Sequence, residues 1–131
     1  MNKVWSELNK TMQGQIKKKD TYKEGIITLF DLRNQLMETL VSFREELSRK
    51  DFDAIPFITA DGYHSKTIAY SIWHIFRIED IVAHTLISEN EQVFFSGNYQ
   101  ERINSPIITT GNELVKEQIA DFSKRLNLEE L

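Results

Sequence analysis

Residues 66–88, KTIAYSIWHIFRIEDIVAHTLIS, carry the broadest apolar pattern of the chain and decide its fold class. Apolar residues recur there every three to four positions. A rotation of about 100° per residue groups five of them on one stripe of a helix: Ile68, Ile72, Ile75, Val82 and Leu86. Other apolar residues widen this stripe on both sides. Because so broad an arc must pack against several neighbours, the segment is predicted to be the central helix of a bundle.

Three further segments show the same helical period. They predict helices over about residues 3–18, 22–48 and 111–125, the last beginning at a capping box, Thr110-Gly111-Asn112-Glu113. The sequence therefore predicts an all-α, up-down four-helix bundle, in one domain spanning residues 1–131.

The connections contain the residues that interrupt helices. Pro56 and Gly62 interrupt residues 49–64, in which a short helical turn is predicted at Lys50 to Ala54. Ser65 is predicted to cap the central helix. Residues 89–110 are predicted to be a long loop, because their apolar pairs are too short for a strand.

Composition excludes several classes of protein. The chain has 131 residues, no cysteine and a formal net charge of −4, and it contains no apolar run of the about 18 residues that a membrane span needs. No secretory leader is visible, so a cytoplasmic protein outside the membrane is expected. Nucleic acid is not an expected partner, because an acidic protein repels a phosphate backbone. The run Lys17-Lys18-Lys19 is interpreted as cations at the end of the first helix.

The histidines of the central helix have different predicted surroundings. His74 falls inside the broad apolar arc, where it is either a hydrogen-bonded core residue or a metal ligand. His84 falls on the polar face with Arg77 and Asp80 and is predicted to be a solvated surface residue, and His64 precedes the helix in a loop. Ten residues of helix separate His74 from His84 by about 15 Å, so the two cannot share one metal ion.

Residues 67–80, TIAYSIWHIFRIED, resemble the second conserved helix of the DinB family of bacterial proteins, which includes YfiT-like metal-dependent hydrolases and thiol-dependent transferases. The resemblance is best over residues 22–88. It implies that His74 is one ligand of a divalent metal, Zn²⁺ or Ni²⁺, which activates water or a thiol on an unidentified small substrate. In that family a later helix gives two more ligands in His-x-x-x-His spacing. No histidine follows His84, so those ligands have no counterpart in this sequence.

The last residues leave two interpretations open. Asn127-Leu128-Glu129-Glu130 repeats the spacing of a helix cap just before Leu131, which predicts either a missing continuation or a frayed terminus. Two functions are likewise compatible with the sequence. One is the DinB-type metalloenzyme, and the other is a non-catalytic helical module that forms a dimer through its exposed apolar faces, near Ile26, Leu36 or Ile75.

Overall fold

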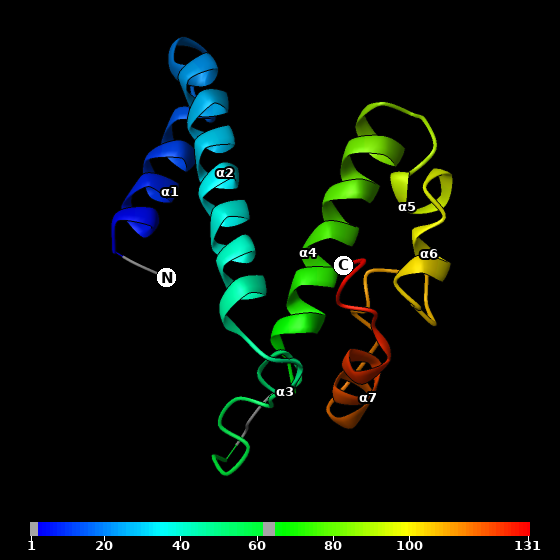
Figure 1. Ribbon diagram of the computed structural model, residues 1–131. Helices are drawn as coiled ribbons and strands as arrows, with labels where there is room; N and C mark the ends of the chain where they lie inside the picture. Colours follow the sequence, from blue (N-terminus) through cyan, green and yellow to red (C-terminus); the bar gives the residue numbers. More distant parts are fainter. Residues whose placement is uncertain (1–2, 62–64) are drawn as a thin grey trace. The chain divides into compact units, whose positions relative to one another are not determined.

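The computed structural model describes residues 3–61 and 65–131, which form helices and turns with no strand among them (Figure 1). The all-α fold class is therefore confirmed. The chain forms two compact units, Met1–Glu46 and Leu47–Leu131. Within the described ranges, no helix has both the length and the apolar character needed to cross a membrane.

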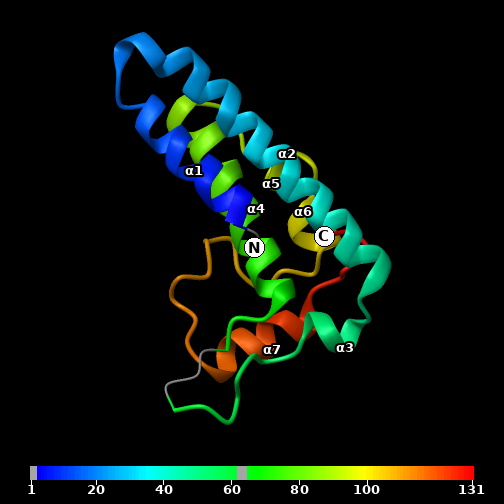
Figure 2. The ribbon, with the colours of Figure 1, turned by 90° about the vertical axis from the view of Figure 1, so that its left-hand side faces the viewer.

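The first unit is a hairpin of two helices, α1 (Lys3–Gln15) and α2 (Tyr22–Glu46), joined through the 3₁₀ turn η1 (Lys19–Thr21). The two helices lie side by side in both ribbon views (Figures 1 and 2). The predicted end of the first helix at residue 18 is too late, because the Thr21 hydroxyl donates a 2.9 Å hydrogen bond to the Gln15 carbonyl and satisfies the helix end there. Met12 and Leu32 are the large buried side chains of this hairpin.

A close approach of the two helices occurs at Gly25. A Cβ atom at this position would lie 2.7 Å from Cγ2 of Ile16, so only glycine lets α2 come this near to the end of α1. On the other part of the hairpin, the Trp5 indole N–H donates a 3.4 Å hydrogen bond to the Leu32 carbonyl. These contacts fix how α1 and α2 face each other.

The second unit is built around α4 (Ile68–Asp80) and its π-helical continuation η2 (Ile81–Ile87). Short helices precede and follow it: α3 (Arg49–Phe52), α5 (Val93–Ser96), α6 (Tyr99–Arg102) and the longer α7 (Glu117–Arg125). The predicted turn near residues 50–54 is confirmed as α3. The core lies between α4 and α7, where the rings of Trp73 and Phe122 pack edge to face at 4.5 Å.

The central helix begins two residues later than predicted. Its cap is Thr67, whose hydroxyl accepts a 3.1 Å hydrogen bond from the Tyr70 backbone N–H, so the prediction that Ser65 caps it is wrong. The Ser65 hydroxyl is buried and finds no partner in the part of the chain that the structure describes. The helix also does not remain α-helical to residue 88, because it widens into the π-helical turn after Asp80.

The prediction of one long loop over residues 89–110 is wrong, because this segment holds α5 and α6. Asp80 at the end of α4 caps the first of these helices, α5. Its carboxylate accepts 2.9 Å hydrogen bonds from the backbone N–H groups of Val93 and Phe94, which are the first donors of α5. A side chain distant in sequence thus supplies the cap that the local sequence lacks.

The predicted start of the last helix at residue 111 is also wrong, because α7 begins at Glu117. The capping box does not form. The Glu113 carboxylate accepts instead from the hydroxyl of Thr109, and Gly111 has a φ of +79°. Side chains of α4 donate hydrogen bonds to the carbonyls of Thr110 and Gly111 and hold this stretch against α4.

Candidate functional site

Three polar side chains on one side of α4 donate hydrogen bonds to a single stretch of backbone. Tyr70, His74 and Arg77 are spaced by four and three residues, which places them on the same helix face. We call them the donor row. Their acceptors are three carbonyls of residues 108–111, which we call the acceptor segment. The Arg77 guanidinium donates to Ile108 at 2.6 Å, the His74 ring to Thr110, and the Tyr70 hydroxyl to Gly111 at 3.0 Å.

The contact with Thr110 defines the tautomer of His74. A carbonyl oxygen only accepts hydrogen bonds, so Nδ1 of the ring carries the hydrogen. The half-buried ring also stacks on Tyr70, with 5.4 Å between centroids and 12° between planes. Nε2 has no hydrogen-bond partner among residues 3–61 and 65–131. In the neutral form of the ring the lone pair is therefore on Nε2, and it can bind a metal ion or accept a proton.

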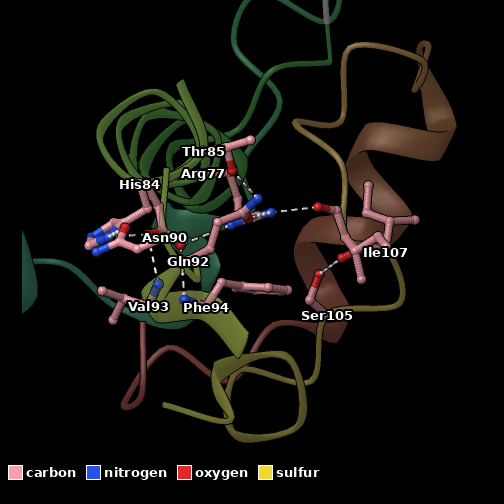
Figure 3. A network of polar contacts seen from close by, with 11 residues as sticks. Arg77, His84, Thr85, Asn90, Gln92, Val93, Phe94, Ser105 and Ile107 are labelled. Atoms are coloured by element: carbon pink, nitrogen blue, oxygen red, sulfur yellow. Dashed lines mark hydrogen bonds and ion pairs between the residues drawn. The ribbon is translucent and has the colours of Figure 1, made fainter. Parts of the chain in front are cut away.

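Arg77 anchors the other end of the donor row. Its side chain is buried, and it donates to the Asp80 carboxylate at 3.1 Å and to the Gln92 amide oxygen at 2.8 Å (Figure 3). The guanidinium also lies over the ring of Phe94, 3.9 Å from its centre. Burial lowers the pKa of Arg77, and the Asp80 carboxylate opposes this shift. Its Nε is buried without a partner in the described residues.

The sequence pattern placed Arg77 on a solvated polar face, and this prediction is wrong. The residues of α5 pack over that side of α4, and Arg77 interacts there with Gln92 and Phe94. A helical wheel assigns a face by residue type and carries no information on what covers it. The only sequence signal was the apolar pair Phe94-Phe95 in a segment otherwise rich in polar residues.

His84 lies on η2 and differs from the predicted solvated histidine. Its Nδ1 donates to the Asn90 side-chain oxygen at 2.8 Å, and its Nε2 lies 3.7 Å from an oxygen of Asp80. Figure 3 shows His84 and Asn90 together beside this network. The side chain is 29% exposed, and both ring nitrogens face protein groups. His64 lies outside the described residues.

The electrostatics of the site favour a protonated phenol on Tyr70. Burial raises the pKa of Tyr70, and the negative charge of Glu113 raises it further. The Thr109 hydroxyl and a backbone N–H donate to the Glu113 carboxylate and lower its pKa, so Glu113 stays ionised. Tyr70 therefore remains a hydrogen-bond donor to Gly111 across the neutral pH range.

A second polar cluster, between α3 and α7, is structural. The Ser123 hydroxyl is fully buried, accepts from Thr67 at 2.7 Å and donates to Asp53 at 2.7 Å. Arg49 donates to the carbonyls of Ser123 and Leu126, which satisfies the C-terminal end of α7. Because the hydroxyl is occupied and inaccessible, Ser123 is not a candidate nucleophile.

The structure does not assemble a complete metal site around His74. In the described ranges, no group of three or more His, Cys, Asp or Glu side chains is placed to hold a metal ion. Comparisons with known proteins add no assignment, since no family model, no curated protein and no solved structure matches the chain. Functional inference therefore rests on the side chains themselves.

Proposed function

We propose that the chain is a DinB-type helical bundle in which His74 Nε2 is one ligand of a divalent metal ion, Zn²⁺ or Ni²⁺. The observation that carries the proposal is the hydrogen bond from His74 Nδ1 to the Thr110 carbonyl. Histidine ligands of metals generally donate their other ring N–H to a carbonyl or carboxylate, which fixes the tautomer and the ring plane. The resemblance of residues 67–80 to the DinB family supports the same residue.

One imidazole alone holds such an ion weakly, so the proposal needs further ligands from outside the described residues. A metal bound there by histidines supplies a Lewis acid that turns water or a thiol into a nucleophile near neutral pH. The contribution of this chain is the oriented imidazole and the aromatic surface of Tyr70 that holds it in place.

The test compares metal-dependent melting of the protein and two histidine variants. Ni²⁺ or Zn²⁺ at 100 times its dissociation constant stabilises the folded state by about 2.7 kcal/mol, which raises the melting temperature. His74→Ala should abolish this rise, while the matched control His84→Ala, on the same helix, should keep it. An unchanged metal response in His74→Ala, or no response in the parent protein, contradicts the proposal.

A second candidate function is a helical dimerisation module without chemistry. It is favoured by the large apolar side chains that α2 exposes, among them Ile27, Phe30 and Val41. This function does not exclude the first, because the residues concerned lie in a different unit from His74.

A further inference from the structure

One side of α2 carries a row of seven exposed residues. They are spaced by three or four positions, so they follow one side of the helix: Lys23, Ile27, Phe30, Asn34, Glu38, Val41 and Glu45. We call them the exposed row. Its three apolar members, Ile27, Phe30 and Val41, are 62%, 59% and 57% exposed. Ile27 and Phe30 adjoin each other on this side of the helix, and Val41 lies about three turns further along it.

The hairpin cannot cover this row by itself. The buried residues of α2, Gly25 and Leu32, lie about 160–180° around the helix from Asn34, at the centre of the row. Gly25 faces the end of α1, as its near contact with Ile16 shows. The exposed row therefore points away from α1, so the hairpin leaves its apolar residues uncovered.

The spacing of the positions in the row is symmetric about Asn34. The successive spacings are four, three, four, four, three and four, which are the same in both directions along the helix. An antiparallel pair of such helices related by a two-fold axis at Asn34 places Ile27 opposite Val41 and Lys23 opposite Glu45. In a two-fold interface each of these contacts occurs twice.

Charge distinguishes this arrangement from a parallel one. The antiparallel pair brings the ammonium of Lys23 to the carboxylate of Glu45 at both ends of the row. A parallel pair in register places Lys23, Glu38 and Glu45 each against the same residue of the other copy, which is repulsive at three positions. At the centre, Asn34 meets its own counterpart, a pairing that fixes register between paired helices.

We propose that the exposed row of α2 is the interface of an antiparallel homodimer with its two-fold axis at Asn34. Phe30 then lies opposite Glu38 of the second copy. These two residues occupy opposite edges of the row, about 80° apart around the helix, so the ring of one copy and the carboxylate of the other lie on opposite sides of the contact. The paired stretch from Lys23 to Glu45 is about 33 Å long. This inference is independent of metal binding at His74.

Disulfide crosslinking tests the geometry directly, because the protein has no cysteine. Ile27→Cys and Val41→Cys, mixed under reducing conditions and then oxidised, should give a crosslinked heterodimer, while each variant alone should stay uncrosslinked. Residue 27 of one copy lies about 21 Å along the axis from residue 27 of the other in the proposed register, far beyond disulfide reach. Efficient self-crosslinking of Ile27→Cys, with no crosslinked heterodimer in the mixture, indicates a parallel pair and overturns the proposal.

Sedimentation measures the oligomeric state with a matched pair of aromatic substitutions. Phe30→Glu should be monomeric at concentrations where the parent protein is dimeric, whereas Phe57→Glu, which changes an exposed phenylalanine in the other unit, should remain a dimer. Lys23→Glu should weaken the dimer at least tenfold, and adding Glu45→Lys should restore it. Helical circular dichroism identifies variants that fail to fold. A monomeric parent protein at millimolar concentration, or a dimeric Phe30→Glu, refutes the proposal. A monomeric Phe30→Glu that keeps the metal response shows that the α2 dimer and metal binding at His74 are independent of each other.

Discussion

Helices α2 and α4 both carry many apolar residues, 11 of 25 in α2 and 8 of 13 in α4, but they differ in which side chains are buried. Helix α4 buries large side chains, including Tyr70, Trp73 and Arg77, whereas α2 buries little more than Gly25 and Leu32. The difference arises from what packs on each helix. The acceptor segment and α5 cover one side of α4 and turn its polar side chains into bound donors. The comparison teaches that the spacing of apolar residues predicts where a helix forms. The segments that pack against the helix decide which of its residues are buried.

Removing a buried donor should have the largest effect. Arg77→Ala leaves the Asp80 carboxylate, the Gln92 amide and the Ile108 carbonyl without their shared partner, and it should lower the free energy of unfolding by about 3–5 kcal/mol. Arg44→Ala, at an exposed position of α2, is the matched control and should change it by less than about 0.5 kcal/mol. Urea denaturation of both variants gives the comparison, and equal effects would remove the contrast between the two helices.

Two glycines, Gly111 in the acceptor segment and Gly14 in α1, should change stability in opposite directions when each is replaced by alanine. At Gly111 an added Cβ meets the Trp73 ring at 2.7 Å and the backbone has positive φ, so Gly111→Ala should cost about 1–3 kcal/mol. At Gly14 in α1 the position is open, and Gly14→Ala should stabilise the protein by about 0.5–1 kcal/mol. Thermal denaturation should therefore move the two melting temperatures in opposite directions. A stable Gly111→Ala would mean that the acceptor segment does not pack against Trp73.

A smaller effect is expected at the Tyr70 phenol. Its pKa is raised in the folded state, so its contribution to stability is complete below the ordinary pKa of about 10 and is lost as the pH rises through the higher folded value. Tyr70→Phe should cost about 1 kcal/mol at neutral pH through the lost hydrogen bond to Gly111. It should also flatten the fall in stability above pH 10. Denaturation at several pH values checks both, and an unchanged alkaline slope speaks against a buried phenol.

The periodic segments were predictable from the sequence, and the residues that surround His74 were not. Hydrophobic spacing placed α1, α2 and α4 closely, and it placed His74 within the broad arc of α4. The capping-box pattern at Thr110 to Glu113 failed for a physical reason. Its carbonyls are bound by Tyr70 and His74, about forty residues earlier, and no local pattern encodes such a contact.

The same limit explains why the sequence did not predict the interactions of Arg77 and Asp80. Both have charged side chains on the less apolar side of α4, which favours solvent exposure in any pattern that counts residue types. Their partners, Gln92 and the first residues of α5, lie in a segment without helical period. Asp80 could be predicted to cap a helix, but the sequence does not specify which one.

The central claim is that the donor row fixes His74 with its hydrogen on Nδ1 and leaves Nε2 free to bind a ligand. Nitrogen-15 chemical shifts of the imidazole of His74, assigned by comparison with His74→Ala and measured above the pH at which the ring is charged, report the tautomer directly. The account predicts a protonated, hydrogen-bonded Nδ1 and an unprotonated Nε2 in the metal-free protein. A ring protonated on Nε2, or an average of both tautomers, would contradict it.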